Sequence, residues 1–567
     1  MNHAEAAAIL QAAGSPFELA TETVNGRTAK VFKTRERSMR EKIANATVHG
    51  DKIFLVYGDW RITFTEFIEY VWGAAHVLED DFGVKRHDRI AILAYNRPEW
   101  LIALFGGASI AAISVGLNGW WTTDEVLYGL NDSGARYLIV DDLLWERVKP
   151  ILPQAKSLET IFYIGDNPPE GTVSIKKLLV RRTDAPTAPL EEDDPFVLLY
   201  TSGTTGRAKG CITTHRGTVA QVQGIFYNTF VHLLFKSAKE GTPPTLPAAP
   251  ATLLTSPLFH VAGLHSTVCA SITAGSKLVF GPPKFDPEFA LKTLQDEQVT
   301  SWMAIPTLLQ RLLDYPKLQD YDLTSLTMIS TGGAPTAPET VEKAHSLLKT
   351  KPSLATSYGL TETHGMATSI GGDEYLERKN SVGRPTPIVE IRVVDDKGND
   401  VKPGRPGLIL VGGPTVTPGY WGRAEETNQT VIDGWLHTGD IGYFDKDGYL
   451  YISDRAKDMI IRGGENVYCV EIENCLADHP EIVEAAVIGV PDRDLGERVK
   501  AVVLRTEGSQ LNAADVKAHV AKQLAKFKVP EEVEFTKDPL PRNPAGKILK
   551  NILRNTGTVS FPPDSHL

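Results

Sequence analysis

The sequence is poor in cysteine and in positive charge, and both shortages exclude classes of protein. Four cysteines in 567 residues make no disulfide framework. Cys469 and Cys475 lie six positions apart without a second ligand pair, so a structural zinc site is not expected. The net charge of −11 argues against general nucleic-acid binding, which needs a basic face. We therefore expect a protein of a reducing compartment that has no nucleic-acid partner.

Secretion signals and membrane spans are also missing from the pattern. The N-terminus has no basic region followed by an apolar core. Residues 100–117 (WLIALFGGASIAAISVGL) are eighteen uncharged residues, close to the length of a span. Their adjacent glycines and β-branched second half favour instead a buried helix that runs into a buried strand. We expect no transmembrane span and a cytoplasmic location, with a peroxisomal alternative because the final SHL resembles a loose peroxisomal tripeptide.

The chain is too long for one core, and its texture changes along its length. Strand-like apolar runs such as 89–95 and 135–142 alternate with helical patterns such as 63–79 and 287–298. This alternation predicts parallel sheets covered by helices. The Pro/Ala-rich stretch 236–251 predicts a surface loop.

Two changes of texture predict the domain boundaries. From about residue 380 short β-rich pieces with glycine turns predict an antiparallel or barrel-like subdomain, and a separate α+β pattern follows the charged stretch SDRAKD. We therefore predict an α/β fold with a large N-terminal domain (1–453, with the β-rich subdomain at 380–453). A hinge (454–458) and a small mobile C-terminal domain (459–567) would follow.

The strongest chemical signal is YTSGTTGRAKG, Tyr200 to Gly210, which continues the apolar run FVLLY. Its hydroxyls, glycines and Lys209 offer backbone N–H groups, hydroxyl donors and a mobile cation, which together suit a polyphosphate. It is not a Walker loop, because Ala208 precedes Lys209 and Gly210 follows it. Taken alone, the segment is also compatible with a solvated glycine-serine turn.

Further segments combine glycine, hydroxyl, carboxylate or a single cation in ways that a scaffold does not need. They are ISTGGAPTAPE (329–339), SYGLTET (357–363), GWLHTGD (434–440), DRAKD (454–458), GGEN (463–466) and PRNPAGK (541–547). In this order, and with YTSGTTGRAKG, they resemble the motif set of the adenylate-forming superfamily. That superfamily includes acyl-CoA synthetases, the adenylation domains of peptide synthetases and beetle luciferases. The resemblance covers nearly the whole chain, and its one departure is Ala208 in place of the usual proline, which loosens the turn but removes no donor.

The resemblance implies an ATP site assembled from distant segments. The phosphate-binding residues would be Thr201, Ser202, Gly203, Thr204, Thr205, Gly206 and Lys209. The AMP-binding residues would be Gly333, Ala334, Pro335, Ser357, Tyr358, Gly359, Asp440 and Arg455. Tyr358 would stack on the adenine, although a tyrosine in such a loop is also compatible with plain packing. Asp440 would accept both ribose hydroxyls, because a carboxylate has acceptor capacity for two donors.

The resemblance also assigns the chemistry and the second face of the C-terminal domain. Lys547 would bridge the substrate carboxylate and the phosphates, Thr361 would contact the α-phosphate, and Glu362 with Thr204 would hold Mg²⁺. Lys457 would be the hinge, while Gly463 and Gly464 would leave room for the pantetheine arm of CoA; Lys457 is equally compatible with a surface lysine on a linker. The acyl pocket would contain His260, Phe230 and Gly332, although His260 is nearly as compatible with simple packing.

These assignments predict an AMP-forming acyl-CoA synthetase that uses ATP, Mg²⁺ and CoA. The segment PLFHVAG lacks the aspartate that would pair an amino-acid ammonium, and VQGIFYNTFVHLLF supplies apolar candidates. We therefore expect an apolar acid, either a medium- to long-chain fatty acid or a bulky aryl or alicyclic acid. Alternatives are transfer of the acyl group to a carrier protein, a luciferase-like reaction, and an ATP- or CoA-sensing binding protein. The sensor is disfavoured because binding alone needs neither Glu362 nor Lys547. We expect only small-molecule partners and a monomer or homodimer.

Overall fold

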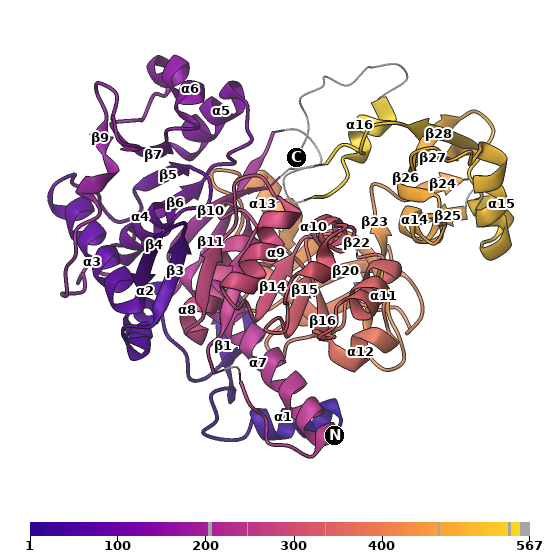
Figure 1. Cartoon of the computed structure of the whole chain (residues 1–567), viewed down its shortest axis with the longest axis horizontal. Coiled ribbons are helices and arrows are strands. Elements are labelled where there is room, and N and C mark those ends of the chain that lie inside the picture. The colour runs from indigo at the N-terminus through magenta and orange to yellow at the C-terminus, as the bar shows by residue number, and fades with distance from the viewer. Residues whose placement is uncertain (202–206, 247, 335, 463–464, 543–545, 556–567) are drawn as a thin grey trace.

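The structure is a computed structural model that describes all residues except 202–206, 247, 335, 463–464, 543–545 and 556–567. Its described part is a mixed α/β fold in which a large N-terminal domain is followed by a small C-terminal lobe (Figure 1). The predicted fold class is confirmed. The final SHL lies outside the described residues, so the peroxisomal alternative stays a prediction.

Two large sheets form the body of the N-terminal domain. The first has the order β11 (Lys209–Thr214), β10 (Pro195–Thr201), β6 (Ile113–Gly116), β5 (Arg89–Leu93), β7 (Tyr137–Asp141), β8 (Thr160–Ile164) and β9 (Val173–Ser174). The second has the order β18 (Arg384–Pro385), β17 (Gly365–Gly371), β16 (Ser353–Leu360), β15 (Met328–Thr331), β14 (Ser301–Ala304), β12 (Ala251–Leu254), β13 (Lys277–Phe280), β3 (Ile53–Tyr57) and β4 (Trp60–Thr63). The central strands of both sheets are parallel. The alternating pattern in the sequence therefore gave the expected arrangement.

Helices connect and cover these strands. Their bounds are α1 (His3–Leu10), α2 (Met39–Asn45), α3 (Phe64–Asp80), α4 (Pro98–Ser109), α5 (Thr123–Ser133), α6 (Trp145–Val148), α7 (His215–Glu240), α8 (Ala270–Ala274), α9 (Pro287–Asp296), α10 (Pro306–Leu313), α11 (Pro338–Leu347), α12 (Gly372–Glu377) and α13 (Ala424–Thr430). One core cluster contains α3 and α4 together with strand residues of both sheets, such as Ile90 and Leu278. Burial between the two sheets therefore makes them one folded unit.

The apolar stretch 100–117 is interior structure. It forms most of α4, whose residues are all buried, and then the buried strand β6. A helix that is apolar on every side is stable only when it is covered on every side. Among the residues that the structure describes, no helix is both long and apolar enough to cross a membrane.

The expected surface loop at 236–251 is partly wrong. Helix α7 continues through Glu240 and ends at Gly241, which adopts φ +68° and donates its N–H to the Ser237 carbonyl. A left-handed glycine is a common helix stop, and Pro243 and Pro244 prevent continuation. The first part of the proposed loop is therefore helix.

A third sheet corresponds to the predicted β-rich subdomain. It contains β19 (Glu390–Val394), β20 (Gly407–Gly412), β22 (Trp435–Phe444), β21 (Val431–Ile432) and β23 (Leu450–Arg455), and its described pairings are antiparallel. A separate hairpin, β1 (Leu19–Val24) and β2 (Arg27–Phe32), lies near the N-terminus.

The C-terminal lobe has its own sheet and its own core. Its elements are β24 (Ile460–Arg462), β25 (Glu465–Val467), α14 (Cys469–Ala477), β26 (Ile482–Asp492), β27 (Gly496–Arg505), α15 (Ala513–Gln523), β28 (Glu532–Thr536) and α16 (Lys550–Asn555). Its core cluster contains residues from Ile460 to Val520, and Figure 1 shows the lobe at the right in orange and yellow. The turn at 456–458 joins β23 of the third sheet to β24 of this sheet. The proposed hinge therefore lies where the chain passes from one sheet to the other.

Candidate functional site

The phosphate-loop candidate sits on a hairpin whose base is held by side chains of α5 and by Arg423, the residue that precedes α13. Strands β10 and β11 pair with Thr201 opposite Lys209, and residues Ser202, Gly203, Thr204, Thr205 and Gly206 between them lie outside the described residues. The Tyr128 hydroxyl donates to the Ala208 carbonyl at 2.8 Å. The Tyr200 hydroxyl donates to Asp132 at 2.9 Å, and Arg423 pairs with the same carboxylate. These bonds fasten the turn at Ala208, where the usual proline is absent.

Strands β14, β15 and β16 end at the same edge of the second sheet and deliver the next group of residues. Ligands of parallel sheets commonly bind at this edge. Gly332, Gly333 and Ala334 follow β15, and Pro335 lies outside the described residues. Ser357, Tyr358 and Gly359 lie near the end of β16. A Cβ on Gly332 would lie 3.3 Å from Ser357 Oγ, so these two segments are in contact.

Tyr358 contacts the carboxylate that was predicted to bind ribose. Its hydroxyl donates to Asp440 Oδ2 at 2.6 Å. Burial, together with the nearby Asp440 carboxylate, raises the pKa of Tyr358, so the hydroxyl keeps its proton and remains a donor. The structure thus brings Tyr358 and Asp440 together, while stacking of Tyr358 on an adenine stays a prediction.

Asp440 and Arg455 are direct cross-strand neighbours in β22 and β23. Arg455 Nε lies 2.6 Å from Asp440 Oδ1, and the Asp440 side chain is only 4% exposed. The backbone N–H of Asp440 donates to Thr438 Oγ1 at 3.1 Å. Each carboxylate oxygen has one described partner and keeps further acceptor capacity, so the group is fixed and can still accept ribose hydroxyls.

Lys547 approaches this pair from the C-terminal lobe. Burial lowers its pKa to about 8, and the charges of Arg455, Asp440, Lys457 and Asp458 also act on it. The preceding residue, Gly546, packs so closely against the N-terminal domain that a Cβ there would lie 2.6 Å from Ile305 Cγ2. In this arrangement, which we call docked, the tail lysine comes close enough to Asp440 for the two charges to interact, although 107 positions separate them in the chain.

Glu362 lies in the short helical turn η6 (Thr361–Thr363), directly after β16. Its Oε1 accepts a hydrogen bond from the Tyr420 hydroxyl at 2.7 Å, and the carboxylate has acceptor sites to spare after this bond. Within the described ranges, no three His, Cys, Asp or Glu side chains are grouped to hold a metal. A single carboxylate fits Mg²⁺, which is commonly held by one or two carboxylates together with substrate phosphates. Thr204, the other predicted metal contact, lies outside the described residues.

Two residues at this turn were missed by sequence reasoning. His364 adopts φ +56°; its Nδ1–H donates to the Thr415 carbonyl at 2.7 Å, and its Nε2 accepts from the Thr214 N–H at 2.8 Å. Burial lowers its pKa to about 3, so the ring is neutral and serves as a fixed connector. Tyr420 is the second; the only signal for it was an aromatic pair between glycines in PGYWG.

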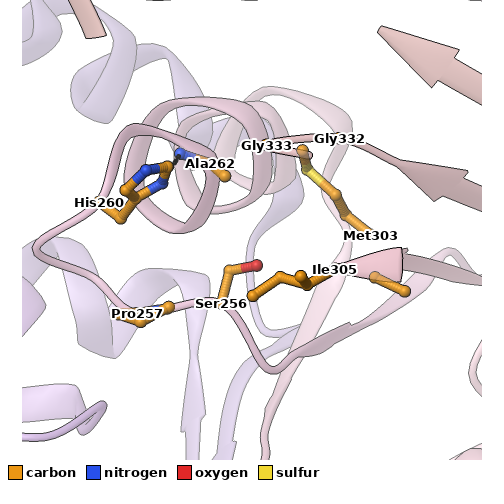
Figure 2. A pocket seen from close by; sticks show the side chains of 9 residues that line it. Ser256, Pro257, His260, Ala262, Met303, Ile305, Gly332 and Gly333 are labelled. Atoms are coloured by element: carbon orange, nitrogen blue, oxygen red, sulfur yellow. Dashed lines mark hydrogen bonds between the residues drawn. The ribbon is translucent and has the colours of Figure 1, made fainter. Parts of the chain in front are cut away.

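A small cavity lies at the edge of β14 and β15 (Figure 2). Its lining residues are Ser256, Pro257, His260, Ala262, Met303, Ala304, Ile305, Gly332 and Gly333. Its volume is about 10 Å³, about one water molecule. His260 Nδ1 accepts from the Ala262 N–H at 3.2 Å, and burial lowers the pKa of His260 to about 4, so its ring is neutral at pH 7.

Of the three predicted acyl-pocket residues, His260 and Gly332 line this cavity and Phe230 does not. The Phe230 ring lies edge-on to Phe17, with 5.8 Å between ring centroids, and Phe226 and Phe235 pack against the same core cluster. This face of α7 meets the N-terminal segment, and a place for Phe230 in the acyl pocket stays a prediction. Met303, in β14, and Ile305, directly after it, were missed because nothing in the sequence marks which residues at the end of this strand face the cavity.

The remaining predicted residues concern the movement of the lobe. Lys457 is exposed in the turn after β23, and the neighbouring Ala456 N–H donates to the Gly439 carbonyl at 2.9 Å. The hinge position is therefore next to the Asp440 strand. Gly463 and Gly464 lie outside the described residues, and their role in a CoA channel stays a prediction.

Comparisons with known proteins find matches over most of the chain. A family model described as "AMP-binding enzyme" matches residues 43–421, and one described as "AMP-binding enzyme C-terminal domain" matches residues 471–547. An indoleacetate–CoA ligase of Aromatoleum aromaticum is 35% identical over 474 residues, which cover 83% of this chain and 89% of the relative. A fatty acid–[acyl-carrier-protein] ligase, ScoC, of Streptomyces coeruleorubidus is 34% identical over 485 residues, 85% of this chain and 89% of the relative. The crystal structure of ATP-bound MatB from Rhodopseudomonas palustris superposes with a TM-score of 0.79 at 29% identity, covering 91% of this chain and 98% of that chain.

Proposed function

The chain belongs to the family of AMP-binding enzymes, and on that premise we propose that it activates an apolar carboxylic acid and transfers the acyl group to CoA. As an AMP-forming acyl-CoA synthetase, it uses ATP to make an acyl adenylate. A carboxylate is a poor acylating agent because oxide would have to leave. AMP is a far better leaving group, which is the chemical reason for the first step.

The observation that carries the proposal is the meeting of Lys547 with Asp440 and Arg455. Burial lowers the pKa of Lys547 to about 8, a shift of the kind that marks functional lysines. A lysine that served only solubility would stay in water, where its ammonium is well hydrated. A buried cation near the ribose-binding candidate suits the phosphates of a bound nucleotide.

In the first half-reaction the substrate carboxylate attacks the α-phosphorus of ATP and pyrophosphate leaves. Negative charge gathers on oxygens around phosphorus, and cations already fixed there stabilise it most effectively. Lys547 would supply this charge from the C-terminal lobe and Lys209 from strand β11, while Asp440 and Arg455 hold the ribose. Mg²⁺ on Glu362 would neutralise phosphate charge when bound.

In the second half-reaction a thiol attacks the acyl carbon and AMP leaves. The docked lobe suits the first step, because Gly546 and Lys547 cover the nucleotide edge of the second sheet. A long pantetheine arm needs a different opening. We propose that the lobe turns about Lys457 between the steps and then presents Gly463 and Gly464, since hinges at loop residues allow such rigid-body changes.

An apolar acid is favoured by the lining of the small cavity. Among its described lining residues none is charged at pH 7, because His260 is neutral there. Met303 is the adaptable side chain in this group, since methionine fits irregular apolar shapes. The acid that we propose is either a medium- to long-chain fatty acid or a bulky aryl or alicyclic acid, and the relatives named for a fatty acid and for indoleacetate support the fatty-acid and the aryl class.

Two assays test the function. A panel of aryl, alicyclic and fatty acids is scored for AMP release with ATP and Mg²⁺, once with CoA and once with a carrier protein as the acceptor. We expect release that depends on both an apolar acid and CoA. AMP release driven only by the carrier protein would favour the carrier-protein alternative that the ScoC relative raises. Binding of ATP without acid-dependent release would favour a sensor.

A further inference from the structure

A short segment, Thr417–Trp421, connects the turn of Glu362 with strand β11, which begins at Lys209. The Thr417 N–H donates to the Glu362 carbonyl at 2.8 Å. On the other side, the Ile212 N–H donates to the Gly419 carbonyl at 3.0 Å, and the Trp421 N–H donates to the Gly210 carbonyl at 2.8 Å. The backbone of the 417–421 segment therefore ties the turn of the metal-ligand candidate to the strand of the phosphate-loop cation.

One side chain of this segment contacts both functional groups directly. The Tyr420 hydroxyl donates to Glu362 Oε1 at 2.7 Å. The ring of the same residue faces Lys209, with Nζ 5.3 Å from the ring centroid, which is within the range of a cation–π contact. Tyr420 is 9% exposed, and its backbone N–H is fixed by Thr427 Oγ1 at 3.0 Å.

We propose that Tyr420 is a positioning residue, which orients the Glu362 carboxylate for Mg²⁺ and holds the Lys209 ammonium for the phosphates. This inference rests on the proposed function, because it needs a nucleotide and a metal at the site. With Oε1 engaged by the hydroxyl, the carboxylate would keep one orientation, and its remaining acceptor sites would be available to hold the cation. Mg²⁺ demands near-ideal geometry, so a ligand that is already oriented binds it with less loss of freedom.

The chemistry of the pair supports a permanent hydrogen bond. A tyrosine hydroxyl has an ordinary pKa of about 10, and an ionised carboxylate offers only acceptors, so the hydroxyl is the donor in this bond. Partners that orient a metal ligand from behind are typically worth about 10- to 100-fold in metal affinity. We expect the same range here.

The test is calorimetric and uses no turnover. ATP binding to the full chain is measured without acid or CoA, once in EDTA and once at saturating Mg²⁺. The dissociation constant in EDTA divided by that in Mg²⁺ is the ratio that reports the coupling between metal and nucleotide. In Tyr420→Phe the ring over Lys209 remains and only the hydroxyl is lost. We expect the ratio to fall roughly 10- to 100-fold, with the EDTA value within about twofold of wild type. Tyr420→Leu also removes the ring and should weaken binding in EDTA as well.

A matched control exists outside the site. The Tyr315 hydroxyl donates to the Glu288 carboxylate at 2.8 Å, so Tyr315→Phe removes a similar bond and should leave the ratio unchanged. Thr427→Val tests the support of the segment without touching the tyrosine side chain, and it should lower the ratio less than Tyr420→Phe does.

The outcomes separate the inference from the function on which it rests. If wild type shows no ATP binding in either condition, the proposed function itself fails. If wild type binds MgATP and Tyr420→Phe has the wild-type ratio, only the role of Tyr420 is overturned. Equal weakening with and without Mg²⁺ in Tyr420→Phe would also overturn it, because the hydroxyl would then support the fold in general. If Tyr420→Phe does not fold, an unchanged ratio in Thr427→Val overturns the proposal and a lowered one supports it.

Discussion

Substituting Gly546 with alanine should impair adenylation while sparing the thioester step. Gly546 directly precedes Lys547 and adopts φ +77°, and an added Cβ would lie 2.6 Å from Ile305 Cγ2 and 3.4 Å from Thr307 Oγ1. Ile305 follows β14 in the N-terminal domain, so the clash exists only while the lobe is docked. The Ile305 methyl belongs to a β-branched side chain and has little freedom to turn aside.

The substitution Gly546→Ala has two free-energy costs, backbone strain and a steric clash, and a control variant separates them. A non-glycine residue with left-handed backbone costs about 1–2 kcal/mol, in the docked lobe and in a rotated lobe alike. Forcing a methyl group into a packed contact costs about 1–3 kcal/mol more, and this part applies to the docked arrangement alone. It corresponds to roughly a fivefold to 150-fold loss of the docked population. Gly496→Ala is the matched control, because Gly496 adopts φ +78° in the same lobe but its added Cβ would meet its nearest atom at an ordinary 3.5 Å.

The assay compares the two half-reactions. Acid-dependent exchange of labelled pyrophosphate into ATP measures the first, and release of CoA ester from supplied acyl adenylate measures the second. We expect Gly546→Ala to lose exchange by the stated factor, with the second half-reaction close to that of Gly496→Ala. Equal losses in both half-reactions, or a Gly546→Ala variant that exchanges as fast as Gly496→Ala, would refute the docked arrangement as the adenylating one.

Two further predictions concern the lobe contact and the ribose site. Burial, together with the Asp478 carboxyl across the lobe contact, raises the pKa of Glu339 from 4.5 to about 7. The docked lobe therefore keeps a proton on Glu339 that the separated lobe releases, so docking should weaken as the pH rises from about 4.5 through about 7. A Glu339→Gln variant should show a flatter pH profile of pyrophosphate exchange over that window, and a profile like that of wild type would contradict this interpretation. Asp440→Asn should weaken ATP binding by roughly 10- to 100-fold, because a hydrogen bond to a charged group is worth about 1.5–3 kcal/mol. In calorimetry this variant should also bind ATP no more tightly than 2′,3′-dideoxy-ATP. A preference for ATP as large as that of wild type would show that Asp440 does not accept the ribose hydroxyls.

The sequence predicted those parts of the site whose chemistry is local in the chain. Asp440 and Glu362 were recognisable because each stands in a short segment with its own glycine, and Arg455 because it lies in the charged stretch DRAKD; the resemblance to the superfamily then gave all three their expected roles. Tyr420 was not, because its role depends on a contact with Glu362 across 58 positions, and a tyrosine between glycines is equally compatible with packing. His364 was missed for a similar reason, since its two ring nitrogens bind backbone groups of two other segments.

The fold could be predicted where a sequence pattern is compatible with only one structural arrangement. The uncharged stretch 100–117 became α4 and β6, because glycine pairs and β-branched residues favour interior structure over a span. Phe230 shows the opposite case: its helical spacing indicated an apolar face of α7, but spacing does not say which neighbour covers that face. Its ring packs against Phe17, a residue that no local pattern connects to α7.

The most direct test of the account uses Lys547→Ala in the same two half-reaction assays. If the tail lysine completes the nucleotide site only in the docked arrangement, exchange of pyrophosphate should fall by about 10²-fold or more, while supplied acyl adenylate and CoA should still give thioester. Gly464→Leu should show the reverse loss. Equal loss of both half-reactions in Lys547→Ala, or exchange at the wild-type rate, would contradict the account.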